Sequence, residues 1–378
     1  MLNILIAPNA FKHSLNAAEV ADAIAEGFNR SKLDCVCHTF PVGDGGDGTG
    51  DLIVKKFNGE RVSVNTHDAL GRPITAEFGL IDNGKTAVIE MAAASGIRLL
   101  KKEELDPLVT STAGTGEMMM AALDKGVSKI ILAMGGSATV DGGTGILSAL
   151  GIEFLNSSGK QLSVPAELDE LVSIDIMGLD KRILACEITV LCDVDNTLLG
   201  DEGSAAVFGP QKGASAKDVV VLNTRLKKFA DITLNQTGID IAAIKHSGTA
   251  GGAAAGLYGL INSKLVAGAD HFLRLTGFNT GLQSADIVIT GEGSIDEQTL
   301  QGKAPFVVSA AAKQKGLPVI GLAGMVPLNP SKELGDNFDA LLAIGNEPAD
   351  LTTALKNTRE NLVRTARYLG DLLAINQQ

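Results

Sequence analysis

Three apolar segments of this 378-residue chain each run directly into a loop of glycines and carboxylates. Glycine lets backbone N–H groups approach an anion closely, and it adopts positive φ angles without strain. Carboxylates beside such loops are what a Mg²⁺–phosphate site requires. The pattern predicts an enzyme that handles phosphate. The segments and their loops are residues 35–42 with 43–49, 130–134 with 135–143, and 286–290 with 291–296.

The two ends of the chain alternate between strand-like and helix-like segments. A buried strand at residues 2–7 precedes an amphipathic helix that opens at Asn16–Glu19 with a capping-box pattern. Such β-α alternation predicts a parallel sheet with flanking helices. The remaining expected elements are a strand at 35–42, a helix at 48–57, a strand at 286–290, a helix at 304–314, strands at 317–322 and 339–344, and a long helix at 350–373.

The middle of the chain has a different character. Residues 61–66, 74–81 and 86–91 read as short strands joined by polar turns, which is typical of antiparallel pairing. Helices and strands alternate again from Gly114 onward. Because the two ends of the chain share a β-α pattern and the middle differs from both, the sequence predicts that one domain is inserted into another. The expected limits are 1–60 plus 285–378 for the outer domain and 61–284 for the inserted one.

Composition excludes several classes of protein. The net charge of −12, the pI of about 4.9 and the absence of Trp argue against a nucleic-acid partner, which requires a basic surface and aromatic stacking. No apolar run is long enough to span a membrane, and the N-terminus carries no basic targeting segment. Four cysteines without metal-ligand spacing indicate reduced thiols. We therefore expect a cytoplasmic enzyme with neither nucleic acid nor membrane as a partner.

Two common nucleotide-binding motifs are missing. No Gly-x-x-x-x-Gly-Lys-Ser/Thr sequence occurs, which excludes a P-loop enzyme. The turn after the first strand, Pro8–Lys12, lacks the glycine fingerprint of a dinucleotide-binding domain, which argues against a dehydrogenase.

Residues 192–196, Cys-Asp-Val-Asp-Asn, leave two alternatives open. Taken alone, they are similar to the nucleophile motif of haloacid-dehalogenase-type phosphatases, in which Asp193 would be the nucleophile and Asp195 the acid/base. Such an enzyme would be Mg²⁺-dependent and would need no ATP. A non-catalytic protein that binds a small acid or a nucleotide is the second alternative.

Six motifs follow one another over nearly the whole chain, at residues 41–49, 110–117, 135–143, 192–196, 208–214 and 290–303. Taken together and in this order, they resemble the bacterial type I glycerate kinase family. The resemblance implies ATP-dependent phosphorylation of glycerate, at the 2-hydroxyl, and D-glycerate and ATP as partners. It also implies a flavodoxin-like parallel-sheet domain with a second α/β domain inserted into it and an active site in the cleft between them.

Phosphoryl transfer requires mainly positioning and charge neutralisation, and the polar residues of these motifs are assigned on that basis. We expect Asp193 to be the base that orients the acceptor hydroxyl, with Asp296 as the second choice and Lys12 as a further catalytic residue. Arg72 is expected to clamp the glycerate carboxylate through two hydrogen bonds.

The remaining assignments concern ATP and Mg²⁺. Backbone N–H groups of the glycine loops and nearby lysines are expected to hold the phosphates, and three carboxylates are expected to bind the metal. The ATP-binding set is Gly135, Gly136, Ser137, Asp141, Lys212, Gly291, Gly293 and Lys303, and the Mg²⁺ ligands are Asp44, Asp47 and Glu292.

Overall fold

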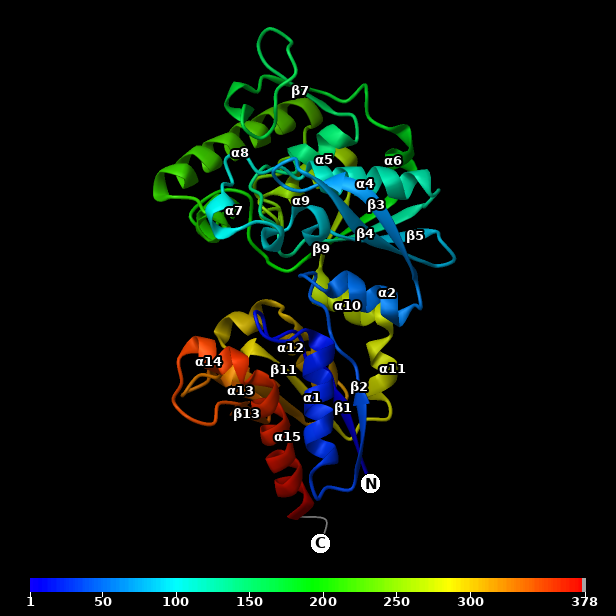
Figure 1. Cartoon of the computed structure of the whole chain (residues 1–378), viewed down its shortest axis with the longest axis vertical. Helices are drawn as coiled ribbons and strands as arrows, with labels where there is room; N and C mark the ends of the chain where they lie inside the picture. The colour runs from blue at the N-terminus through cyan, green and yellow to red at the C-terminus, as the bar shows by residue number, and fades with distance from the viewer. Residues whose placement is uncertain (376–378) are drawn as a thin grey trace. The chain divides into compact units, whose positions relative to one another are not determined.

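The computed structural model describes residues 1–375, and their contacts divide the chain into two compact units. The first unit contains residues 1–44 and 269–378, and the second contains residues 45–268. The chain thus leaves the first unit once and returns to it, as the colours of Figure 1 show. This is the connectivity of an inserted domain.

The units change at residues 44/45 and 268/269, whereas the sequence predicts domain limits at 60/61 and 284/285. Helix α2 (Thr49–Lys56) accounts for the earlier change, because it packs against strands β4 and β5 of the second unit. At the second boundary, helix α11 (Phe278–Leu282) belongs to the first unit. Its Phe278 ring packs edge-on against the Phe40 ring of that unit, with the ring centroids 5.1 Å apart. The predicted limits stay a prediction.

A five-stranded parallel sheet forms the first unit. Its strand order is β13-β12-β11-β1-β2, which is the flavodoxin-like order, so the predicted fold is confirmed. The order reverses between β1 and β11, and such a switch point is where ligands bind in open α/β sheets. The strands are β1 (Leu2–Ile6), β2 (Cys35–Thr39), β11 (Ile287–Ser294), β12 (Val319–Met325) and β13 (Ala340–Ala343).

Helix α1 (Ala17–Asn29) begins at the predicted capping box. The Asn16 side chain accepts the Glu19 N–H at 3.0 Å, and the Glu19 carboxylate accepts the Asn16 N–H at 2.9 Å. The helix packs closely against α15 (Thr358–Ala374), because Gly27 has no Cβ; one built there would overlap with the Val363 carbonyl. Gly27 therefore sets the distance between these two helices.

The long helix predicted at 350–373 is two helices, α14 (Leu351–Lys356) and α15. The Leu355 carbonyl lies at the break and accepts two hydroxyl groups, from Ser14 at 2.6 Å and from Thr358 at 2.9 Å. Both side chains thus bind a backbone carbonyl at the point where α14 ends. The other helices of this unit are α10 (Gly268–Thr276), α12 (Ala304–Lys313) and α13 (Lys332–Asn337).

A six-stranded mixed sheet forms the second unit, in the order β10-β9-β6-β5-β4-β3. The pairs β3–β4 and β4–β5 are antiparallel, as the sequence predicts, and the other pairs are parallel. The strands are β3 (Glu60–His67), β4 (Pro73–Ile81), β5 (Thr86–Glu90), β6 (Lys129–Ala133), β9 (Glu187–Cys192) and β10 (Lys264–Ala267); β7 (Glu153–Leu155) and β8 (Ser173–Asp175) form a separate antiparallel pair.

Helices surround this second sheet and bury an apolar core (Figure 1). Phe154 and Phe229 meet edge-on in the core with ring centroids 6.1 Å apart, and both are fully buried. The helices are α2, α3 (Ala92–Ser95), α4 (Ala113–Asp124), α5 (Thr144–Ala149), α6 (Lys181–Ala185), α7 (Ser204–Phe208), α8 (Ala216–Thr237) and α9 (Ala253–Ile261).

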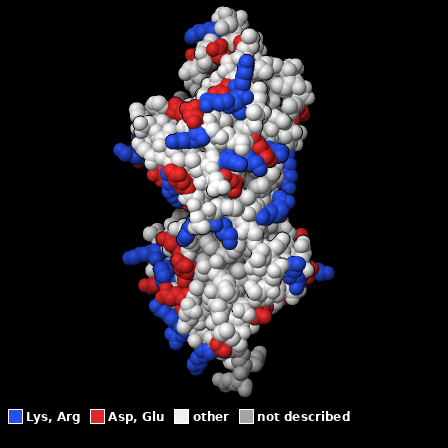
Figure 2. Space-filling view, turned by 90° about the vertical axis from the view of Figure 1, so that its right-hand side faces the viewer, with Lys and Arg blue, Asp and Glu red and all other residues white. Residues whose placement is uncertain are grey.

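Acidic and basic side chains are intermixed on the face drawn in Figure 2, so this face carries both signs of charge side by side. Within residues 1–375, no helix combines the length and the apolar content that a membrane crossing would require.

The close packing of α1 on α15 generates a prediction for Gly27→Ala. The added methyl group meets the Val363 carbonyl and the Ala366 side chain, so we expect a loss of about 1–3 kcal/mol in the free energy of unfolding. Gly335→Ala in α13 is the matched control, because no heavy atom lies near its Cβ position. Thermal unfolding should show a lower Tm for the first variant and an unchanged or higher Tm for the second. Equal Tm values for the two would contradict the packing argument.

Candidate active site

The first unit gathers charged side chains at the carboxyl edge of its parallel sheet. Lys12 lies in the turn after β1, Asp44 follows β2, and Glu292 lies near the carboxyl end of β11. These strands are neighbours around the β1/β11 switch point. Because parallel strands end at one edge, residues that are far apart in the sequence meet there.

Hydrogen bonds fix the two carboxylates of this edge. The Asn9 amide donates to Asp44 Oδ2 at 2.8 Å, and the Thr299 hydroxyl donates to Glu292 Oε1 at 3.1 Å. Burial raises the pKa of Glu292 to about 7; the charge of Asp44 adds to this, whereas Lys303 and Lys12 oppose it. The structure thus brings two predicted carboxylates and two predicted lysines within electrostatic reach of one another. We call Lys12, Asp44, Glu292 and Lys303 the first-unit cluster.

The loop predicted at 291–296 is in part a strand, because β11 continues to Ser294. Gly291 makes this possible, since a Cβ at this position would overlap with the Leu322 carbonyl of β12. Asp296 lies beyond the strand end and caps a 3₁₀ turn over Glu297–Gln301, where its Oδ1 accepts the Gln298 N–H at 2.9 Å. Asp296 therefore has a local structural role in addition to the role predicted for it.

In the second unit, Lys212 is the central charged residue. It is 3% exposed, and its Nζ donates to the Ser137 hydroxyl at 2.8 Å and to the Thr139 carbonyl at 2.7 Å. Burial lowers the pKa of Lys212 to about 8, and the charges of Asp141 and Asp193 oppose this shift. Three residues predicted from separate motifs, Ser137, Lys212 and Asp193, are thus brought together, and we call them the second-unit cluster.

Asp141 is fully buried, and its carboxylate oxygens accept hydrogen bonds from other groups of the protein. Its Oδ2 accepts the Thr112 N–H at 2.9 Å and the Thr112 hydroxyl at 2.7 Å, and its Oδ1 accepts the Gly143 N–H at 3.0 Å. Burial raises the pKa of Asp141, and these hydrogen bonds counteract the rise. Part of the glycine loop that was predicted to bind phosphate therefore binds the chain's own carboxylate and sets the start of α5.

The Asp193–Asn196 segment follows β9, and residues 245–248 bind it through an ion pair and a backbone hydrogen bond. Lys245 Nζ lies 3.0 Å from Asp195 Oδ2, and the Gly248 N–H donates to the Asn196 carbonyl at 2.9 Å. Asp195 is thereby engaged in an ion pair, while Asp193 is half-buried near Lys212. The two acids of this motif have different surroundings.

The glycines at 248–252 were missed by the sequence analysis. A Cβ at Gly248 would overlap with the Thr197 carbonyl, and one at Gly251, whose φ is +69°, would overlap with the Thr139 carbonyl. This segment therefore joins the 193–197 segment to the loop after β6. A cluster of glycines was the available signal, but the segment has no carboxylate and so did not match the pattern of the other loops.

Two arginines of this unit differ in their partners. Arg72, the predicted carboxylate clamp, donates from Nε to Asp68 Oδ2 at 2.6 Å and from Nη1 to Glu104 Oε1 at 2.8 Å. Arg98, which the sequence analysis did not select, donates from Nη1 to Asp47 Oδ2 at 2.7 Å. Arg98 follows Ile97, whose N–H donates to the Gly136 carbonyl, so it lies beside the loop after β6.

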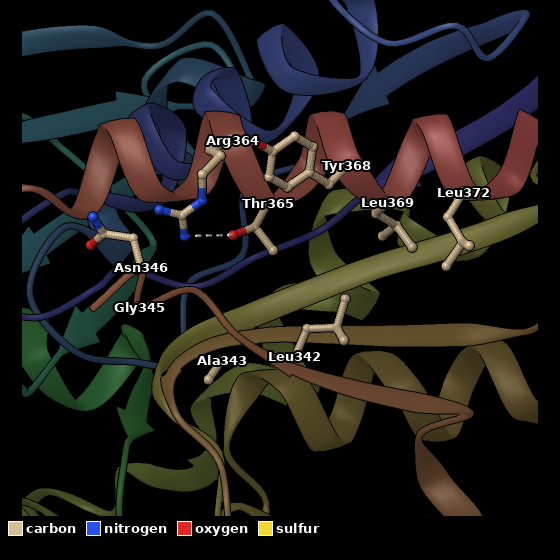
Figure 3. Close-up of a pocket in the computed structure, with 9 residues that line it drawn as sticks. All are labelled: Leu342, Ala343, Gly345, Asn346, Arg364, Thr365, Tyr368, Leu369 and Leu372. Atoms are coloured by element: carbon tan, nitrogen blue, oxygen red, sulfur yellow. Dashed lines mark hydrogen bonds between the residues drawn. The ribbon is translucent and has the colours of Figure 1, made fainter. Parts of the chain in front are cut away.

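Two hollows lie outside the two clusters. One of about 510 Å³ lies in the first unit between the end of β13 and α15 (Figure 3), and it contains none of the predicted site residues. The other, of about 250 Å³, lies in the second unit and is lined by Glu90 and Arg98 among others. Among residues 1–375, no group of at least three His, Cys, Asp or Glu side chains is arranged to hold a metal ion. The predicted cleft between the domains stays a prediction.

Comparisons with known proteins give one consistent result. The model of the glycerate kinase family matches residues 4–374. A protein named glycerate kinase from Halalkalibacterium halodurans is 43% identical over 378 residues, which cover 100% of both chains. A protein named glycerate 2-kinase from Escherichia coli is 37% identical over 378 residues, which cover 100% of this chain and 99% of that protein.

A solved structure agrees with the sequence matches. The crystal structure of a protein from Salmonella typhimurium, described as a proposed glycerate kinase 2, superimposes with a TM-score of 0.83 at 41% identity and covers 100% of this chain and 99% of that one. These matches do not favour a phosphatase built on Asp193 and Asp195 or a non-catalytic binding protein. Because the family model and full-length relatives agree over nearly every residue, the chain belongs to the glycerate kinase family, a family of phosphotransferases that act on an alcohol group.

Proposed function

We propose that this enzyme transfers the terminal phosphoryl group of ATP to the 2-hydroxyl of D-glycerate and uses Mg²⁺. The observation that carries the proposal is the second-unit cluster, in which a buried lysine lies beside a hydroxyl and within electrostatic reach of a carboxylate. The Escherichia coli relative, which is named a glycerate 2-kinase, supports the choice of hydroxyl.

The positive charges of both units have a defined use in this reaction. Phosphoryl transfer depends on positioning and on neutralising the charge that spreads over the phosphate oxygens. Lys12 and Lys303 of the first-unit cluster and Lys212 of the second are the cations that we assign to this task. With a net charge of −12 on the chain, such local cations are needed to attract an anionic nucleotide and an anionic acid.

Asp193 is the residue that we propose as the base for the acceptor hydroxyl. The charge of Asp193 acts on the buried Lys212, so the two side chains lie within electrostatic reach of each other. Asp296 is the second candidate, and its side chain is already engaged as the cap of a 3₁₀ turn. Both carboxylates are half-buried, and the proximity of Asp193 to Lys212 is the reason for placing it first.

For the glycerate carboxylate we propose Arg72, with Arg98 as the alternative. A guanidinium group can hold a carboxylate through two parallel hydrogen bonds. Arg72 already binds both Asp68 and Glu104, whereas Arg98 binds Asp47. Substrate binding at Arg72 would therefore take place beside two existing ion pairs.

The residues of the first-unit cluster fit a Mg²⁺ ion. Mg²⁺ commonly takes one or two carboxylates and completes its shell with phosphate oxygens and water. Asp44 and Glu292 are close enough for the Asp44 charge to raise the pKa of Glu292, so a cation there would relieve an existing repulsion. We propose that these two residues hold the ion; the assignment of Asp47, which lies in the second unit, as a third ligand stays a prediction. The bound ion would neutralise phosphate charge.

The proposed reaction predicts ATP consumption that depends on D-glycerate and yields 2-phosphoglycerate. A coupled assay for ADP over a panel of small hydroxy acids, with ³¹P NMR of the product, measures both points. Formation of 3-phosphoglycerate would contradict the proposed regiochemistry. Release of phosphate from phosphoesters without ATP, or binding of the acid without turnover, would overturn the proposed reaction.

Asp193→Asn is expected to lower kcat by about 100-fold to 10,000-fold, the range for loss of a general base, with little change in the KM for ATP. The matched control is Asp195→Asn, which changes the neighbouring acid of the same segment and is expected to retain most of the activity because Asp195 faces Lys245. Near wild-type turnover of a folded Asp193→Asn variant would show that the base has been assigned wrongly.

The low pKa of Lys212 predicts a specific dependence of stability on pH. Between its folded pKa of about 8 and its higher value in the unfolded chain, the unfolded chain binds more protons at this group, so the group's contribution to stability increases as the pH rises. The stability of wild type relative to Lys212→Met should therefore increase by about 2 kcal/mol between about pH 8 and about pH 10. Urea unfolding at both pH values measures the difference. A difference that does not change with pH would show that Lys212 titrates normally.

A further inference from the structure

We propose that Glu90 is a positioning residue that holds the loop of residues 45–49 in place at the carboxyl edge of the second unit's sheet. No role was assigned to Glu90 from the sequence. It is the last residue of β5, and its neighbour in the sheet is Ala133, the last residue of β6. The inference rests on the proposed function, because the loop carries Asp47.

The carboxylate of Glu90 binds the start of helix α2. Its Oε1 accepts the Gly50 N–H at 2.7 Å, and the Asp51 N–H lies at 3.4 Å. The residue before the helix is Gly48, with φ +87°, and it offers no side chain to cap the first N–H groups. An N-cap side chain usually supplies the acceptor for these N–H groups. Here Glu90 supplies it from strand β5.

Gly50 is fitted to this contact. A Cβ built on it would lie 2.7 Å from Glu90 Cγ, which is closer than real Cβ atoms approach other atoms, and 3.1 Å from Glu90 Oε1, which is a tight contact. A larger residue at position 50 would push the carboxylate away from the helix. The contact thus depends on both partners, which lie on different elements of the same unit.

The other end of the loop is held by the strand beside β5. The Gly45 carbonyl accepts the N–H groups of Met134 at 3.0 Å and Gly135 at 3.1 Å. A Cβ at Gly135 would overlap with Gly46, so the two backbones are in direct contact. The loop is therefore fixed at one end by the residues after β6 and at the other by the last residue of β5.

Asp47 lies between these two attachments, and its partly exposed carboxylate accepts a hydrogen bond from Arg98. Loss of the Glu90 contact would free the start of α2 and with it the residues that set the position of Asp47. A displacement of about 1 Å at a residue that positions substrate costs about 100-fold in rate.

The surroundings of Glu90 are unfavourable for a carboxylate that only caps a helix. Burial and, to a smaller extent, the charges of Asp51 and Asp47 raise the pKa of Glu90 to about 7, against the opposing effect of the two backbone N–H groups. Burying a carboxyl group beside two others costs free energy of folding, and such arrangements cluster at functional sites. This favours a role in the site over a purely structural cap.

Glu90→Ala and Glu90→Gln test the inference. The first removes the acceptor and is expected to lower kcat by about 10-fold to 100-fold; the second keeps an acceptor oxygen for Gly50 and is expected to stay within about threefold of wild type. Asp180→Ala is the control, since it removes a carboxylate that caps α6 in the same unit, accepting the Arg182 N–H at 2.9 Å. It should lower the Tm and leave kcat unchanged.

Amide hydrogen exchange gives a readout that is independent of activity. The amides of residues 45–51 should exchange faster in Glu90→Ala, whereas Glu90→Gln and Asp180→Ala should leave them protected. Gly50→Ala tests the same contact from the opposite side and suits a helix better than glycine does. It should reproduce the loss of kcat, and the double variant Glu90→Ala/Gly50→Ala should be no worse than either single variant, because the contact is already absent.

Several results would overturn the inference. They are wild-type kcat in folded Glu90→Ala or Gly50→Ala, failure of Glu90→Gln to retain activity, or unchanged exchange of the loop amides. Asp47→Ala separates this inference from the proposed function. Full activity of Asp47→Ala would remove the assigned role of Asp47, whereas an inactive Asp47→Ala beside a fully active Glu90→Ala would overturn the role of Glu90 alone.

Discussion

Direct contact between backbones is the constraint on which the site of the second unit depends. Gly135 lies against Gly46, and Gly251 lies against Thr139, so closely that neither glycine could carry a side chain. The loop after β6 therefore packs on residues 45–49 and on residues 248–252 without intervening side chains, and Gly248 packs in the same way on the Thr197 carbonyl of the segment after β9. The polar side chains that these loops do carry, such as Ser137 and Asp193, are held in a small volume by backbone that has little freedom to move.

This packing has an electrostatic consequence, because it buries charge. Removing an ammonium or a carboxylate from water is costly unless other groups replace the water. Lys212 has two hydrogen-bond acceptors and two carboxylates within reach, and Asp141 receives hydrogen bonds from Thr112 and from glycine N–H groups. A lysine held in this way is oriented before substrate arrives, which is the property that the role proposed for Lys212 in phosphoryl transfer requires.

The sequence predicted the parallel sheet of the first unit, the antiparallel strands of the second and the family correctly, because these follow from periodicity and from ordered motifs. It predicted one helix at 350–373 where there are two, and at the break the Leu355 carbonyl binds the hydroxyl of Ser14 from the other end of the chain. It placed Gly291 in a loop, although β12 pairs with it as part of a strand. Each difference involves a contact with a partner that is remote in the sequence.

By itself, the sequence determined which residue types are available for chemistry and where strands open into glycine loops, because local pattern encodes both. Only the tertiary structure decided what each charged group does. Asp141 is saturated by the protein, Asp193 lies half-buried near a buried lysine, and Glu90 receives the start of a helix. The physical reason is that the surroundings of a charge, namely its burial and its hydrogen-bond partners, come from elements brought together only when the chain folds.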